Sequence, residues 1–202
     1  MKQQEIIKAS LDRSVSSIEY ENLLQSYAKD GKTSGADKED LIYYTKLNAQ
    51  RSRRIHKTIA VQAELAKQVS TLAKQTWLLI TETWCGDAAN SVPVIAKLAE
   101  ENPNVDLRIV LRDENIELMD QFLTRGGRSI PKLIALDQEL KVLFDWGPRP
   151  QEAQKLYWDW RESENRSPYS EFHVVLQKWY NDDKASLIQG ELLEKLLSQA
   201  ES

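Results

Sequence analysis

Trp84-Cys85-Gly86-Asp87-Ala88 is the stretch that decides the fold, because it stands where a strand should give way to a helix. An apolar run at residues 77–80 precedes it, and apolar residues at helical spacing follow over residues 92–99. Cys85 is the only cysteine among the 202 residues. A thiol at a helix start faces unpaired backbone N–H groups and the positive end of the helix dipole, and both stabilise a thiolate. We therefore expect the pKa of Cys85 to lie below the value of about 8.5 of a free cysteine.

Two prolines add to this signal. Pro93 lies eight residues after Cys85, inside the predicted helix, where a proline removes a backbone hydrogen bond and kinks the axis. Ile130-Pro131 opens the next apolar run, and an X-Pro linkage adopts the cis form at a cost of roughly 0.5–1 kcal/mol. The alternative is that Cys85 is a small buried apolar residue, as lone cysteines usually are.

Trp84, Cys85, Gly86, Pro93 and Pro131 together resemble the thioredoxin superfamily, over about residues 75–148. That family carries Trp-Cys-Gly-x-Cys at a strand-to-helix turn, a kinking proline eight residues after the first cysteine, and a cis-proline that faces the thiol. The chain looks most like a bacterial subgroup with Trp-Cys-Gly-Asp and a downstream Gly-Pro-Arg-Pro, here residues 147–150.

This resemblance also has departures. Ala88 stands at the position of the second cysteine, and the family's buried acid and its lysine fall on Leu79 and Ile109. A dithiol enzyme needs its second thiol to resolve a mixed disulfide. Dithiol–disulfide cycling within one chain is therefore excluded by composition.

Asp87 has two opposing effects that the sequence leaves open. A carboxylate in the first helical turn favours the helix. It also repels a neighbouring thiolate and raises the pKa of the cysteine. Its influence would be small if the side chain faced solvent.

The resemblance implies that Cys85 is the catalytic residue and that Trp84, Gly86, Asp87, Ile130 and Pro131 bind substrate. Trp84 would shield the sulfur, and cis-Pro131 would place the Ile130 backbone where an extended substrate pairs with it as a strand. The first hypothesis is single-thiol redox chemistry, in which Cys85 attacks a disulfide and a small thiol such as glutathione resolves the mixed disulfide. The expected partner is a disulfide- or thiol-bearing protein or a small thiol.

Two other classes of function remain open. The fold could serve as a binding scaffold without turnover, with the helical extensions as the partner surface. Glutathione-transferase-like chemistry is the third class, although about 50 residues after the core are few for its all-helical domain. We expect no cofactor, and no metal either, because His56 and His173 are the only histidines and are distant in sequence.

Charge is distributed unevenly along the chain. Residues 1–74 carry a formal charge of +4 and residues 75–202 one of −8, which gives the net charge of −4. The basic part could dock on an acidic surface but is too weak to indicate nucleic acid. The run Arg51-Ser52-Arg53-Arg54 is either a solvated helix face or an anion- or partner-binding patch.

No part of the sequence predicts a membrane segment. The start of the chain has no apolar stretch of signal-peptide length, and nowhere do eighteen apolar residues follow one another. A single cysteine also fits a reducing compartment. We therefore expect a cytoplasmic protein with no membrane partner.

The predicted elements follow the order β-α-β-α-β-β and then a closing helix that starts near Pro150. They indicate an α/β thioredoxin-like fold, a mixed central sheet flanked by helices. We expect three parts in one compact unit: a helical N-terminal extension at 1–74, a thioredoxin-like domain at 75–163 and a helical C-terminal extension at 164–202. The core elements are expected at residues 76–82, 86–102, 105–111, 115–123, 131–136 and 141–146.

Overall fold

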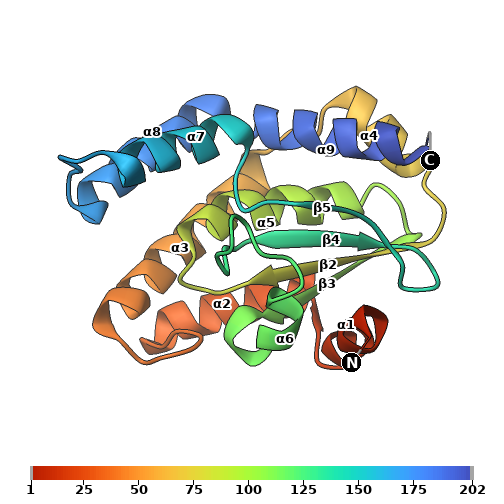
Figure 1. The fold of residues 1–202 in the computed structure, drawn as a ribbon, viewed down its shortest axis with the longest axis horizontal. Coiled ribbons are helices and arrows are strands. Elements are labelled where there is room, and N and C mark those ends of the chain that lie inside the picture. The colour runs from red at the N-terminus through yellow and green to blue at the C-terminus, as the bar shows by residue number, and fades with distance from the viewer. Residues whose placement is uncertain (1, 201–202) are drawn as a thin grey trace.

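A mixed β-sheet forms the centre of the computed structural model, which describes residues 2–200 (Figure 1). Within these residues the strand order is β1-β3-β2-β4-β5. Strand β2 is parallel to β3 and antiparallel to β4, while β1 and β5 add antiparallel edges. The expected α/β class and mixed sheet flanked by helices are confirmed. The strands are β1 (Val15–Ser16), β2 (Gln75–Thr81), β3 (Val105–Leu111), β4 (Lys132–Leu136) and β5 (Val142–Trp146).

Helices cover both faces of this sheet. Helix α5 lies on one face with α4 and α9 beyond it, whereas α1 and α6 lie on the other face (Figure 1). The short α6 follows a 3-10 turn at Arg112–Glu114. The helices are α1 (Gln3–Leu11), α2 (Ser17–Asp30), α3 (Glu39–Thr58), α4 (Ala63–Ser70), α5 (Gly86–Ala99), α6 (Ile116–Met119), α7 (Gln151–Glu162), α8 (Tyr169–Asp183) and α9 (Ser186–Ala200).

The central strand β2 supplies the middle of the core. Its residues 77–80 have no exposed surface, as expected for a strand with neighbours on both edges and helices on both faces. Leu79 pairs in register with Ile109 of β3, and both side chains are buried. The positions of the family's acid and lysine are therefore apolar core in this protein.

A break separates α3 from α4 in the N-terminal part of the chain. Ser16 and Glu19 form a capping box at the start of α2, with Ser16 Oγ accepting from the Glu19 N–H at 3.2 Å. Helix α3 ends at Thr58 and α4 begins at Ala63, so apolar residues at helical spacing over residues 41–72 are divided between two helices. Gln189 of α9 holds the break: its side chain accepts from the Gln62 N–H and donates to the Ala60 carbonyl. A contact from the far end of the chain thus satisfies backbone groups that a continuous helix would have paired internally.

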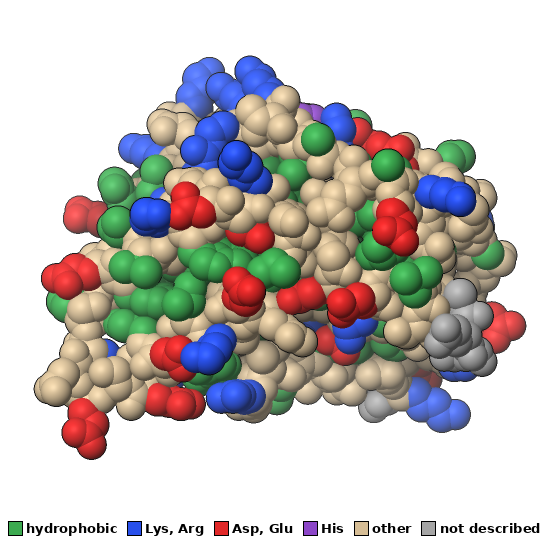
Figure 2. Space-filling model, turned by 90° about the horizontal axis from the view of Figure 1, so that it is seen from above, with side chains coloured by type: hydrophobic (Ala, Val, Ile, Leu, Met, Phe, Trp, Pro, Cys, Tyr) green, Lys and Arg blue, Asp and Glu red, His purple; other side chains and the backbone are tan. Residues whose placement is uncertain are grey.

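The C-terminal helices α7 and α8 form a pair that packs through aromatic rings. Trp160 stacks on Phe172 with centroids 4.7 Å apart, and Tyr157 contacts both rings. In the view from above, apolar side chains gather over this pair at the left of the molecule (Figure 2). Helix α7 starts directly after Pro150, as predicted. The pair brings α8 to the start of α5, where the candidate site lies.

Gly147, in the loop after β5, tests how closely this loop approaches Pro131. Its φ is +116°, and a Cβ on it would overlap the carbonyl oxygen of Pro131. We expect Gly147→Ala to lower the free energy of unfolding by at least about 2 kcal/mol, because both backbone strain and a backbone clash result. Gly190→Ala is the matched control: it lies in α9 with open space around the new Cβ, and should raise stability by about 1 kcal/mol. Urea denaturation of both variants measures this, and an unchanged Gly147→Ala would contradict the close approach.

Candidate functional site

Cys85 lies at the N-cap of α5, directly after the loop that leaves β2. Its side chain is buried, with 6% of the residue exposed, and Sγ donates to the Ile130 carbonyl at 3.3 Å. The Ile130-Pro131 peptide is cis, as the resemblance implied. The structure therefore brings Cys85, Ile130 and Pro131 together.

Asp87 does not face solvent. Its Oδ2 lies 2.6 Å from Arg149 Nη2, and its Oδ1 accepts from the Tyr180 hydroxyl at 2.9 Å. All three side chains are nine-tenths or more buried. The Arg149 guanidinium also lies over the ring of Tyr157, 4.3 Å from its centroid. This cluster connects the first turn of α5 to the loop after β5 and to α8.

The pKa of Cys85 is raised to about 12, mainly because burial disfavours the thiolate and secondly because Asp87 repels it. The backbone N–H groups of Ala88 and Asp87 and the charge of Arg149 favour the thiolate but do not outweigh these effects. The expectation that Cys85 titrates below about 8.5 is therefore wrong. Burial of the sulfur by the rest of the fold outweighs the effect of the helix start.

The same buried charges act on Arg149 and Tyr180. Burial alone would lower the pKa of Arg149, but Asp87, Tyr180 and Cys85 outweigh it and raise the pKa above its ordinary value. The pKa of Tyr180 is raised well above its ordinary value by burial and then by Asp87. At neutral pH the cluster holds a charged pair with a neutral phenol that donates to the carboxylate.

Helix α8 covers the first turn of α5. A Cβ on Gly86 would lie 2.9 Å from His173 Nε2 and 3.7 Å from Arg51 Nη1. Asn90 and Gln177 exchange two amide hydrogen bonds of 3.2 and 3.1 Å between the helices. The cavity between Gly86, Asp87 and α8 has a volume of about 10 Å³, which is room for about one water molecule. Burial and the charge of Arg51 lower the pKa of His173, so its imidazole stands over Gly86 mainly in the neutral form.

Trp84 lies beside this site rather than over an open sulfur. It is half-buried under the guanidinium of Arg112, which is 5.0 Å from its ring centroid. Glu82, three residues before Cys85, is fully buried, accepts from the Asp113 N–H at 2.9 Å and contacts the Ser34 hydroxyl. Burial raises the pKa of Glu82. This carboxylate holds the loop that carries Trp84 against the 3-10 turn.

Sequence reasoning missed four residues of this region: Glu82, Arg149, His173 and Tyr180. Arg149 had a signal, since it belongs to the Gly-Pro-Arg-Pro run, but the run alone does not name Asp87 as its partner. His173 and Tyr180 had none, because their contacts depend on how α8 folds back. Among residues 2–200 no group of three or more His, Cys, Asp or Glu could hold a metal ion. In the same part of the chain, no helix is both long and apolar enough to cross a membrane.

The sequence profile described as thioredoxin matches residues 35–164, well over half of the chain. The chain belongs to the thioredoxin family. Among curated proteins no sequence matches this thioredoxin-family protein.

Two solved structures share its fold. One is a protein of unknown function from Pseudomonas aeruginosa, with a TM-score of 0.57, 17% identity, and coverage of 75% of this chain and 85% of that chain. The other is an HIV epitope-scaffold, with a TM-score of 0.55, 15% identity, and coverage of 91% and 99%. At these identities the likeness concerns the thioredoxin-like fold alone.

The alkylation rate of Cys85 tests the covered thiol. We expect an apparent pKa near 12 in the native protein, since burial and Asp87 both oppose the thiolate. Asp87→Asn should lower that pKa, because it removes the repelling charge and leaves Arg149 beside the sulfur. Because Asp87 is buried, the difference should change little between low and high salt. Rates measured against pH for both proteins give the result, and a native pKa below about 8.5 would contradict the covered thiol.

The buried ion pair gives a second prediction. Arg149→Met should destabilise the protein by about 3–5 kcal/mol, because it leaves the Asp87 carboxylate buried and unpaired. Combining it with Asp87→Asn should recover part of that loss, so that the double variant is more stable than the sum of the single changes predicts. Tyr180→Phe should cost less, roughly 1.5–3 kcal/mol, since one hydrogen bond to a charged group is lost. Chemical denaturation of the four variants checks this, and strict additivity would show that the two charges do not interact.

Proposed function

We propose that this thioredoxin-family protein is a binding module that does not turn over disulfides. The observation that carries the proposal is the state of Cys85: its sulfur is buried against the Ile130 carbonyl and its pKa is raised to about 12. At neutral pH only about one molecule in 10⁵ would hold a thiolate, which is the form that attacks a disulfide.

Two further features support this proposal. Cys85 is the only thiol in the sequence, so no second thiol of the chain can resolve a mixed disulfide. Helix α8 covers the turn over which a substrate chain would lie, with His173 against Gly86 and Gln177 bonded to Asn90. The site therefore combines a poor nucleophile with a closed approach.

Single-thiol redox exchange is the second candidate, and one observation favours it. Arg149 and the N–H groups of Ala88 and Asp87 all act to lower the pKa of Cys85. If α8 moved away, burial would decrease and these groups would favour the thiolate. In this candidate the Cys85 thiolate attacks a substrate–glutathione disulfide, forms a disulfide with the glutathione sulfur and releases the substrate as a thiolate. A second glutathione thiolate then attacks that disulfide, which forms oxidised glutathione and releases Cys85 as a thiolate.

We further propose membership of the subgroup with Trp-Cys-Gly-Asp and Gly-Pro-Arg-Pro. The support is that Asp87 of the first motif and Arg149 of the second form a buried ion pair, so each charge is neutralised by the other motif. A reducing compartment, the cytoplasm of a bacterium, is the location we propose, because the single cysteine is free rather than engaged in a disulfide.

A glutathione-coupled disulfide assay separates the two candidates. With a peptide–glutathione mixed disulfide as substrate, we expect the protein to be no faster than its Cys85→Ser variant. Gln177→Ala, which loosens α8, should also remain inactive, and Lys178→Ala on the exposed side of α8 is its matched control. Turnover that requires Cys85 in the unmodified protein would overturn the proposal. Turnover that appears only in Gln177→Ala would favour the second candidate.

A further inference from the structure

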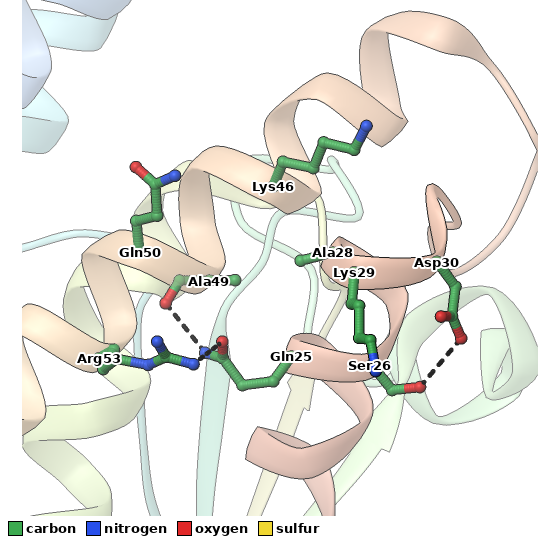
Figure 3. A pocket seen from close by; sticks show the side chains of 9 residues that line it. All are labelled: Gln25, Ser26, Ala28, Lys29, Asp30, Lys46, Ala49, Gln50 and Arg53. Carbon is green, nitrogen blue, oxygen red and sulfur yellow. Dashed lines mark hydrogen bonds between the residues drawn. The ribbon is translucent and has the colours of Figure 1, made fainter.

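An open groove runs between α2 and α3, away from the covered thiol (Figure 3). It has a volume of about 740 Å³ and is lined by side chains of both helices. Lys29, Lys46 and Arg53 contribute positive charge, and Asp30 is the acid of the lining. The Ser26 hydroxyl donates a hydrogen bond to Asp30 Oδ2 at 3.4 Å. The lining therefore has a net positive charge.

Arg53 is held in place at the end of this groove. Its Nη2 donates to Gln25 Oε1 at 2.6 Å, while Gln25 Nε2 donates to the Ala49 carbonyl at 2.9 Å and to Glu21 at 2.7 Å. Figure 3 shows this chain of contacts from Arg53 through Gln25 to the α3 backbone. A guanidinium that is fixed on one side keeps its other N–H groups for a planar, bidentate acceptor such as a carboxylate.

The positive charge of this region has no carboxylate partner within the described residues. Residues 46–58 of α3 contain five Lys or Arg and no Asp or Glu. In the part of the chain that the structure describes, no ion pair joins any of these five residues, or Lys29, to a carboxylate. Most of the chain's negative charge lies elsewhere, in residues 75–202. Of the basic run left open by the sequence, only Arg53 lines the groove, because Arg51 lies at Gly86 and Arg54 bonds Asn181 of α8.

A second hollow adjoins the groove, and its lining includes both apolar side chains and the charged residues Glu21, Glu100 and Lys57. It has a volume of about 310 Å³ and shares Gln25 and Arg53 with the groove, so that the guanidinium stands between the two. Val92, Pro93 and Ala96 of α5 line it, and Ile18, which is 74% exposed, lies at its rim. A large apolar side chain would fit against Val92, Pro93 and Ala96, whereas an acidic one would fit only in the groove, because Glu21 and Glu100 line the second hollow.

We propose that this surface binds an acidic segment of a partner protein in which a large apolar side chain adjoins Asp or Glu residues. A carboxylate of the segment pairs with Arg53, flanking acids lie near Lys29 and Lys46, and the apolar side chain enters the hollow beside Ile18. The inference rests on the proposed binding function and names its partner class. A protein segment fits better than a nucleic acid, because the cationic surface is short and the whole chain carries a net charge of −4.

Binding of a fluorescent peptide, with glutamates around one leucine, tests this surface by anisotropy. We expect Arg53→Gln to weaken binding about tenfold, because a charge-assisted pair is lost. Arg54→Gln is the matched control: it removes the same charge from the same helix, but Arg54 bonds Asn181 of α8 and does not line the groove. It should change binding by less than about twofold. Circular dichroism of each variant checks that it is folded.

The apolar part has its own pair of variants. Ile18→Ser should weaken binding about fivefold, whereas Val174→Ser, at a similarly exposed position on α8, should leave it unchanged. Replacing the leucine of the peptide by alanine should remove the effect of Ile18→Ser. Cys85→Ser should bind as the unmodified protein does, so this assay and the disulfide assay fail independently.

Three outcomes would overturn the inference. The first is an absence of peptide binding, and the second is equal losses for Arg53→Gln and Arg54→Gln, which would indicate diffuse attraction only. The third is tighter, Arg53-dependent binding of a single-stranded oligonucleotide of the same charge, which would make the surface a nucleic-acid site.

Discussion

The buried ion pair between Asp87 and Arg149 is the interaction on which the arrangement around Cys85 depends. Both charges have left water, and that loss is offset only if they stay together and keep their other hydrogen bonds. Arg149 therefore fixes the loop after β5 against the start of α5, and the Tyr180 hydroxyl adds α8 to the same carboxylate. Such a pair contributes little net stability compared with apolar packing, but it strongly disfavours other arrangements of the three segments.

The thiol is affected by this arrangement in two opposite ways. Arg149 alone would favour the thiolate of Cys85. It is paired with Asp87, however, and Asp87 repels the thiolate more strongly than Arg149 attracts it. With α8 packed over Gly86, burial then decides the outcome and the sulfur remains protonated. A cysteine in the family's reactive position thus becomes part of the core, and the surface proposed for a partner lies on α2 and α3 instead.

Local patterns predicted most of the fold. The apolar run at 77–80, the alternation at 105–111 and the helical spacing after Cys85 each report burial on one or both sides of an element, so β2, β3 and α5 follow from them. The position of the break between α3 and α4 did not follow, because Gln189 in α9 stabilises it from a distant part of the chain. The short strand β1 is also missing from the pattern, since two residues are too few to show a period.

By itself, the sequence determined the fold class, the position of Cys85 at a helix start, and the absence of a second thiol. These depend on residue type, spacing and composition, which are local or countable. Only the tertiary structure decided whether Cys85 is exposed, where the Asp87 carboxylate points, and which cations lack a partner. The physical reason is that desolvation and charge pairing depend on groups that are distant along the chain. Asp87 and Tyr180 are 93 residues apart and become neighbours only when α8 folds back over α5.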